Sequence, residues 1–324
     1  MRIHIAPRWP GCIRAGAARV GTVALLLVLA AAHAAWAQQL EPRAYSASPT
    51  GVNFVGMGYT YSTGDVLFDP TLPFSDVRAQ LNIAVPFCVR TFGLFGRAAS
   101  AGLTTPVAWG SVEGNVAEER RRVERSGFGD VSMRLAVNLV GGPALSPREF
   151  ATRKPATTLG ASLVVTLPTG QYDSSKLINL GTNRWAFKPE VGLSHPWRRW
   201  WLEAYAGVWL FTTNDDFFGG QVRKQEPIGV VQGHVVRAFK TRVWAAFDAT
   251  YYYGGETTLD GVHKTDLQSN SRAGVTLALP VMRSHSVKLG YARGVTARTG
   301  SKLETVAVAW QYFWFHREAA PAGR

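Results

Sequence analysis

Between residues 130 and 140, apolar and polar side chains alternate along the chain. Met133 and Leu135 alternate with Ser132 and Arg134, and the same spacing continues to the end of the segment. In a β-strand successive side chains point to opposite faces, so this spacing gives one apolar and one polar face. On an α-helix Arg134 would share a face with apolar neighbours. The segment Asp130–Val140 is therefore predicted to be a strand with Arg134 on its polar face.

The alternation recurs along the chain, which predicts an all-β protein of about twelve strands. In one example the apolar residues Val77, Leu81 and Ile83 alternate with Arg78 and Gln80. One segment contains Pro106, which cannot donate to a ladder and weakens that prediction. The further predicted segments are Val52–Tyr61, Val77–Val85, Arg97–Trp109, Thr158–Leu167, Trp185–His195, Leu202–Leu210, Ile228–Phe239, Val243–Tyr252, Ala273–Leu279, Val287–Arg293 and Lys302–Phe315.

Two architectures can hold this many alternating strands. One is a soluble β-sandwich, and the other is a transmembrane antiparallel outer-membrane β-barrel with lipid-facing apolar residues and lumen-facing polar ones. The mean hydropathy is close to zero, as that alternation produces in a barrel. Aromatic residues gather near strand ends, as in membrane-interface girdles, with Trp197, Trp200 and Trp201 beside one predicted turn. The barrel is therefore favoured.

The connectors between predicted strands alternate in length. Outer-membrane barrels have short periplasmic turns and long extracellular loops. With the N-terminus on the periplasmic side, the chain follows this rule except at Gly141–Ala156, which is long where a short turn is expected. The short connectors are Gly93–Gly96, Pro196–Arg199, Lys240–Arg242 and Pro280–Ser286, and the long ones are Ser62–Asp76, Gly110–Ser126, Pro168–Asn183, Thr212–Pro227 and Gly254–Asn270.

The first 37 residues have the organisation of a cleavable export signal. Four arginines precede an apolar run, Val20–Ala32, and Ala35–Ala37 places small residues where signal peptidase needs them. The run is about 13 residues long, whereas a membrane-spanning helix needs roughly 20, so a retained anchor is disfavoured. We predict cleavage before Gln38, leaving residues 38–324 as a single barrel domain with a short tail, 316–324.

Charge and cysteine usage narrow the possible partners. Removal of residues 1–37 lowers the formal net charge from +13 to +9. Export argues against nucleic acid as the partner of this basic chain, and lipopolysaccharide phosphates are the expected counter-charges. Cys88 is the only thiol in the mature chain, so no intrachain disulfide is expected. The run Arg120–Arg125, interspersed with glutamates, could bind those phosphates or form a solvated loop.

Charged and aromatic residues on the polar faces are the candidate lumen residues. The charges balance in sign when Asp76 is counted with them, so their default role is to pair across strands, with guidance of an ion or substrate as the alternative. The aromatic side chains could stack on an aromatic solute or fill a narrow lumen. The candidates are Arg78, Asp130, Arg134, Lys188, Glu190, Trp201, Glu203, Tyr205, Trp209, His234, Asp248, Tyr252, Arg272 and Lys288.

A barrel-borne hydrolase would need a serine, a histidine and an orienting polar group. The nearest serine candidate, Ser284-His285-Ser286, lies in a predicted short turn whose polarity is explained by its position. His234 and Asp248 are predicted to face the lumen on adjacent strands, where a structural hydrogen bond is the simpler interpretation. The histidines are not spaced for a shared metal. The sequence predicts no catalytic residue, metal or cofactor.

Several short motifs occur in a fixed order: Gly127-Phe128-Gly129-Asp130, Leu167-Pro168-Thr169-Gly170-Gln171-Tyr172, Ala249-Thr250-Tyr251-Tyr252-Tyr253-Gly254-Gly255, Gly290-Tyr291, Thr299-Gly300-Ser301 and Trp310-Gln311-Tyr312. With the strand and loop plan, they resemble the outer-membrane transporter family named for the meta-pathway of phenol degradation, found in Gram-negative bacteria. The resemblance covers nearly all of the mature chain. It implies passive uptake of small hydrophobic or aromatic compounds, and it brings no binding residues with it.

The sequence leaves two alternatives to a transporter, a non-transporting structural or surface barrel and a lipid hydrolase. The aromatic terminus of the last strand, Trp310–Phe315, is similar to the signal that the barrel assembly machinery recognises. Here nine residues follow it, His316–Arg324, whereas barrels of this kind usually end at the aromatic residue.

Overall fold

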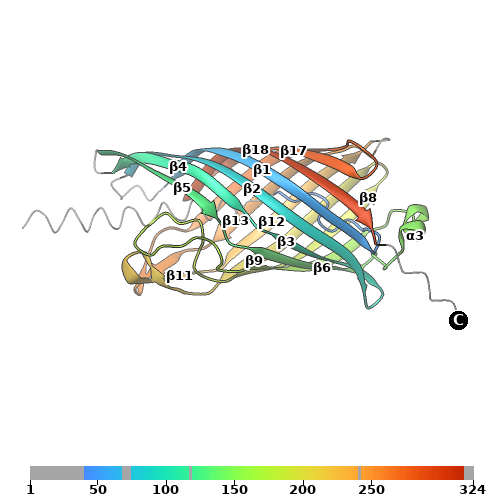
Figure 1. The fold of residues 1–324 in the computed structure, drawn as a ribbon, viewed down its shortest axis with the longest axis horizontal. Helices are drawn as coiled ribbons and strands as arrows, with labels where there is room; N and C mark the ends of the chain where they lie inside the picture. The colour runs from blue at the N-terminus through green and yellow to red at the C-terminus, as the bar shows by residue number, and fades with distance from the viewer. Residues whose placement is uncertain (1–39, 68–73, 117–118, 240–241, 317–324) are drawn as a thin grey trace, which may run out of the picture.

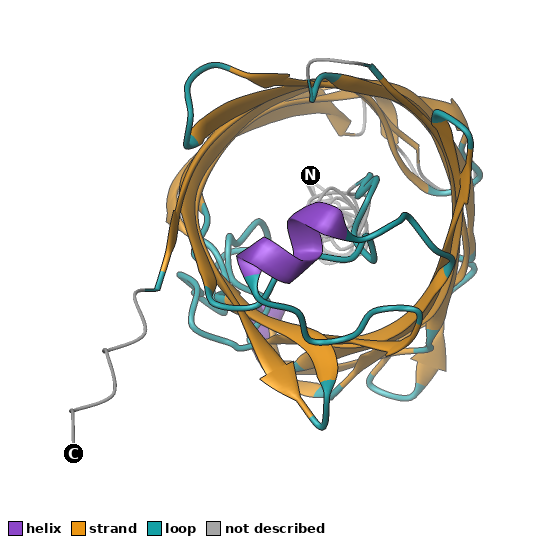
Figure 2. Ribbon diagram, turned by 90° about the vertical axis from the view of Figure 1, so that its right-hand side faces the viewer, coloured by secondary structure: helices purple, strands orange, loops and turns teal. Residues whose placement is uncertain are grey.

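The computed structural model describes residues 40–67, 74–116, 119–239 and 242–316, which form a closed antiparallel barrel of twelve strands (Figures 1 and 2). Sequential strands pair with their neighbours, and β1 pairs with both β18 and β2, so the ring has no open edge at its ends. Closure pairs the backbone groups that lipid could not satisfy. The ring consists of β1 (Val52–Leu67), β2 (Phe74–Leu94), β3 (Arg97–Thr104), β6 (Ser132–Val140), β7 (Thr158–Thr166), β8 (Ala186–Trp197), β9 (Trp200–Phe211), β12 (Ile228–Ala238), β13 (Trp244–Gly254), β16 (Gln268–Pro280), β17 (His285–Thr296) and β18 (Gly300–Phe315).

A long hairpin extends the wall at one end of the barrel (Figure 1). It consists of β4 (Val107–Val116) and β5 (Glu119–Phe128), and β4 continues the path of β3 along β2 beyond Pro106. The prediction of a loop at Gly110–Ser126 is therefore wrong. Outside the membrane a strand needs no apolar face, and cross-strand ion pairs such as Arg120 with Glu113 stabilise a charged hairpin instead.

The same end carries a second, four-stranded sheet built from two of the connectors predicted as loops. Its strands are β10 (Asn214–Phe217), β11 (Gln221–Gln225), β14 (Thr257–Leu259) and β15 (Val262–His263), and the 3₁₀ helix η1 (Phe218–Gly220) joins the first two. Phe217 and Leu259 of this sheet form a buried cluster with Leu177 of the connector between β7 and β8. This small core explains why these segments are ordered.

Short turns and one helix occupy the opposite end, which the connector lengths predict to face the periplasm. Phe95 and Gly96 make a two-residue turn with φ values of 49° and 74°, the geometry that matches the twist of paired strands. The long connector Gly141–Ala156 contains α3 (Pro147–Thr152), which lies across the mouth of the barrel (Figure 2). Ser146 and Glu149 cap its first turn reciprocally.

Side chains alternate between lipid and lumen in the way predicted for β6. Leu135 is 50% exposed on the outer face, whereas Arg134 is half-buried and lines the lumen cavity. The same alternation exposes large apolar side chains around the barrel, as a lipid-facing surface requires. Within the described residues no helix is long and apolar enough to cross a membrane.

β2 has the reverse orientation to the one predicted. Leu81, Ile83 and Val85 line the lumen cavity, whereas Arg78 lies on the outer face with its side chain 71% exposed. Its Nε is 3.4 Å from Asp65 Oδ1. β2 has 21 residues, about twice the 9–11 that cross a bilayer, so much of it lies beyond the lipid, where polar residues can face outward. The prediction that Arg78 faces the lumen is wrong.

The export signal, its cleavage site before Gln38 and tail residues 317–324 lie outside the described residues.

Candidate functional site in the barrel lumen

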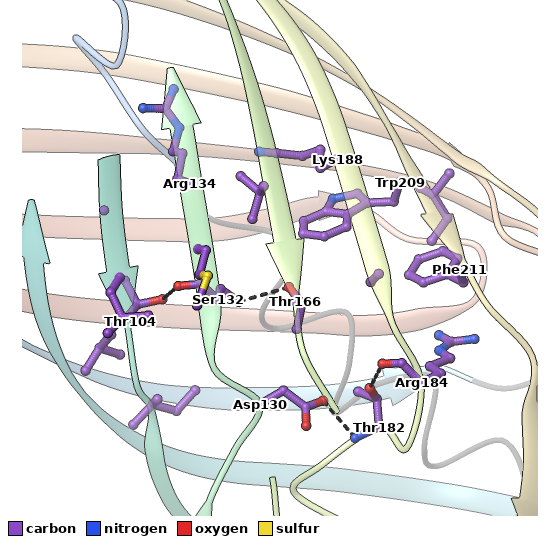
Figure 3. A pocket seen from close by; sticks show the side chains of 18 of the residues that line it. Thr104, Asp130, Ser132, Arg134, Thr166, Thr182, Arg184, Lys188, Trp209 and Phe211 are labelled. Carbon is purple, nitrogen blue, oxygen red and sulfur yellow. Dashed lines mark hydrogen bonds between the residues drawn. The ribbon is translucent and has the colours of Figure 1, made fainter. Parts of the chain in front are cut away.

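A cavity of about 320 Å³ lies inside the barrel, beneath the long connector between β7 and β8. This connector, residues 167–185, folds inward and is called the inward loop below. Figure 3 shows Arg134, Lys188 and Trp209 projecting from neighbouring strands, with Asp130 and Arg184 near the strand ends. The volume is at the lower end of the range for small-molecule sites.

One wall of the cavity is apolar. It is formed by alternate residues of β2 and includes Leu81, Ile83, Val85, Phe87 and Val89. These side chains are on the lumen side because β2 is reversed relative to the prediction. The cavity can therefore remove apolar surface of a solute from water, which favours binding by a free energy of about 25 cal/mol per Å² buried.

The opposite wall carries aromatic and cationic side chains from β8 and β9. The rings of Trp209 and Phe211 are stacked, with centroids 6.4 Å apart and an interplanar angle of 8°. Lys188 Nζ lies 5.5 Å from the Trp209 ring centroid and 3.1 Å from Glu190 Oε2. The ammonium group is thus both paired and held over an aromatic face.

Asp130 fixes the inward loop in the lumen. Its Oδ1 accepts a hydrogen bond from the Gly170 amide and its Oδ2 accepts one from the Thr182 amide, each 2.8 Å long. The Gln171 amide also donates to the Phe128 carbonyl. Two motifs that the sequence resemblance rests on, residues 127–130 and 167–172, therefore contact each other, and their role is to position this loop.

The inward loop brings Arg184 into the cavity, a residue that sequence analysis did not select. Its guanidinium lies 4.3 Å from the Phe211 ring centroid, and its Nη2 donates to Gln225 Oε1 at 2.5 Å. Burial lowers the pKa of Arg184, the nearby Arg223 guanidinium lowers it further, and Asp130 raises it. Burial likewise lowers the pKa of Arg223, and the nearby Asp266 carboxylate opposes part of this effect. Two buried cations thus face each other at the top of the cavity.

Residues 40–51 lie inside the barrel below the cavity, and Glu41 reaches its lining. The Tyr45 hydroxyl lies 2.8 Å from Ser162 Oγ and donates to Glu190 Oε1 at 3.0 Å. The Arg43 amide donates to Glu203 Oε2 at 2.7 Å. Lumen carboxylates predicted to pair across strands therefore also hold this N-terminal segment.

His234 and Asp248 form the predicted hydrogen bond, with Nδ1 and Oδ1 2.6 Å apart and both side chains fully buried. The Thr276 hydroxyl donates to the other carboxylate oxygen. His234 Nε2 has no partner within the described residues. The His285 ring, at the start of β17, stacks on the Trp310 ring. In the described part of the chain, no group of three or more potential metal ligands is present.

The other predicted lumen residues are on inner faces of the ring, in contrast to Arg78. Asp130, Arg134, Lys188, Trp209 and Tyr252 line the cavity itself. The remaining predicted lumen residues lie around and below the cavity, as the alternation along their strands and their contacts show. They are Glu190, Trp201, Glu203, Tyr205, His234, Asp248, Arg272 and Lys288.

Sequence reasoning missed the apolar β2 wall, Arg184, Arg223 and Tyr45. Helix α3 was missed as well, and it is the one missed feature with a local signal, the Ser146–Glu149 capping box. The others depend on contacts between segments far apart in the chain. Phosphate binding and a solvated charged loop were the two interpretations of the arginines in residues 120–125. Arg120, Arg121 and Arg122 are each ion-paired with a glutamate on the exposed hairpin.

Comparisons with known proteins agree with this architecture. Residues 48–310 match the model of a family described as "Putative MetA-pathway of phenol degradation". The sequence matches no curated protein. The structure is similar to an outer membrane channel from Pseudomonas putida F1, with a TM-score of 0.72 and 20% identity, over 85% of this chain and 100% of that one.

Two autotransporter barrels are more distant. The transport unit of AIDA-I from Escherichia coli has a TM-score of 0.49 and 12% identity, over 90% of this chain and 96% of that one. The β domain of the Bordetella autotransporter BrkA has a TM-score of 0.46 and 8% identity, over 81% and 99%.

Proposed function

The chain belongs to the family described as "Putative MetA-pathway of phenol degradation", and from this premise we propose that it is an outer-membrane channel for passive uptake of small hydrophobic or aromatic compounds. The single observation that carries the proposal is the lumen cavity, with the apolar wall of β2 on one side and the stacked Trp209 and Phe211 rings on the other. Stacked and apolar surfaces favour an aromatic solute over a sugar.

The cavity also bears on the alternative that large side chains simply fill the lumen. Trp209 and Tyr252 border about 320 Å³ of open space. A non-transporting barrel needs no such space beneath an ordered inward loop. This supports a route through the barrel interior, with the inward loop and residues 40–51 as the two segments that restrict it.

We further propose that the protein reaches the outer membrane of a Gram-negative bacterium through cleavage of the export signal before Gln38. The aromatic end of β18 would be recognised by the barrel assembly machinery, and lipids and lipopolysaccharide would surround the exposed apolar face. N-terminal sequencing of protein from the outer-membrane fraction checks both location and cleavage. A start at Met1 would contradict the cleavage.

Solute flux into vesicles of phospholipid and lipopolysaccharide tests the function. The full mature protein is reconstituted, and entry of catechol is compared with entry of arabinose after subtraction of protein-free vesicles. We expect the protein to accelerate catechol more than arabinose. A protein that accelerates neither solute would contradict the proposal.

A further inference from the structure

Four buried polar atoms in the cavity lining have no hydrogen-bond partner within the described residues. They are Arg134 Nη2, Arg184 Nη1, Trp209 Nε1 and Tyr252 Oη. Each can donate a hydrogen bond, and for the first three donation is the only possibility. A buried donor without a partner costs free energy, so the cavity favours a ligand that accepts hydrogen bonds.

The charges around the cavity are unevenly satisfied. Asp130 already accepts two backbone hydrogen bonds, and Lys188 is paired with Glu190. Arg184 is only 4% exposed and forms no ion pair with a carboxylate within the described residues. An unpaired buried cation is costly unless a counter-charge approaches it.

We propose that the cavity binds a small aromatic carboxylate, with its carboxylate towards Arg184 and its ring between Trp209 and the apolar wall of β2. This inference rests on the proposed function and specifies the charge of the solute. Planar guanidinium groups match the geometry of carboxylates. The apolar wall, formed by residues such as Ile83 and Phe87, then covers the body of the ligand.

Two simpler ligands use only part of this lining. A neutral aromatic compound covers the apolar wall but brings no charge to Arg184. A small inorganic or aliphatic anion pairs with Arg184 but leaves the wall formed by Ile83 and Phe87 uncovered. The combination of both surfaces in one cavity therefore favours a ligand with both properties.

Equilibrium binding to the detergent-folded full mature protein tests this inference. Calorimetric titrations compare benzoate, benzyl alcohol and acetate, which separate the charge from the apolar ring. We expect benzoate to bind about tenfold or more tightly than either of the others. Equal affinities for benzoate and benzyl alcohol would overturn the proposal.

Arginine variants locate the effect. Arg184→Gln is expected to remove the preference for benzoate, whereas Arg184→Lys should retain part of it. Arg120→Gln is the control, because Arg120 lies on the exposed hairpin with its side chain 71% exposed. Arg184→Lys provides the test if heat-modifiable gel migration shows that Arg184→Gln does not fold. An undiminished preference for benzoate in folded Arg184→Gln, or in Arg184→Lys where Arg184→Gln does not fold, would contradict the assignment.

The binding and flux experiments test the two proposals independently. A channel that passes catechol but does not bind benzoate preferentially would support the proposed function and contradict the inference of an aromatic carboxylate. A barrel that passes no solute would contradict the proposed function, whichever ligand it binds.

Discussion

The ring of Tyr45 lies edge-on to the ring of Tyr205, with centroids 4.9 Å apart and an interplanar angle of 74°. The backbone of β8 makes room for this contact at Gly192. A Cβ there would lie 2.1 Å from Tyr45 Cδ2, far inside van der Waals contact. The N-terminal segment therefore occupies a complementary site on the lumen wall.

Gly192→Ala is expected to displace Tyr45 and residues 40–51 from the lumen wall. Because these residues lie within the lumen, the ion conductance of single channels in planar bilayers should rise above that of the native protein. Gly233→Ala is the matched control, since a Cβ at Gly233 meets nothing within 4 Å. Equal conductance in all three proteins would show that this segment does not restrict the lumen.

The sequence was sufficient for the strand plan but not for the lumen contents. Alternation identified all twelve ring strands, and on β6 it also identified the correct faces of Arg134 and Leu135. On β2 the same pattern gave the wrong faces, because a strand that extends beyond the bilayer is no longer constrained to keep its apolar residues outward. Alternation defines two faces, and it does not say which one meets lipid.

The site itself depended on long-range contacts that no local pattern carries. Arg184 enters the cavity only because Asp130, 54 positions earlier in the sequence, holds the inward loop through backbone amides. Tyr45 reaches Ser162 and Glu190 across the barrel. The lumen candidates chosen by alternation were therefore mostly placed correctly, while the segments that shape the cavity were missed.

Asp130→Ala is expected to loosen the inward loop. The change removes both acceptors for the Gly170 and Thr182 amides, and a buried group left without its partner costs about 1–3 kcal/mol. Proteolysis of residues 167–185 in vesicles with the long loops outward should become faster. Asp215→Ala, at an exposed position of β10, is the control. The same cleavage rate in both variants would contradict the role of Asp130.

Leu135→Arg and Arg134→Gln should differ in their effect on stability. Arginine at Leu135 places a charge in lipid and is expected to cost about 2–4 kcal/mol near the bilayer midplane. Arg134 faces the lumen, so its replacement should cost less. Urea titrations of folding into vesicles measure both. Equal destabilisation would mean that the faces of β6 are misassigned.

The turn at Asp173 in the inward loop should depend on pH. Hydrogen bonds from Lys176 and Ser175 lower the pKa of Asp173 from 3.8 to about 2. Because the pKa is lower in the folded state, the carboxylate stabilises the turn fully above pH about 4, and this contribution is lost as pH falls through about 2. A ¹³C NMR titration of the carboxyl group should show a midpoint near 2, whereas a midpoint near 4 would contradict these contacts.

The central claim is that aromatic solutes pass through the lumen beside Trp209. The most direct measurement is the ratio of catechol to arabinose flux into vesicles for the native protein, Trp209→Ala and Trp310→Ala. Trp310 is the control because it lies on the outer face, 43% exposed. We predict a ratio above one for the native protein and Trp310→Ala, and a ratio close to one for Trp209→Ala. An unchanged ratio in Trp209→Ala, or no preference in the native protein, would contradict the account.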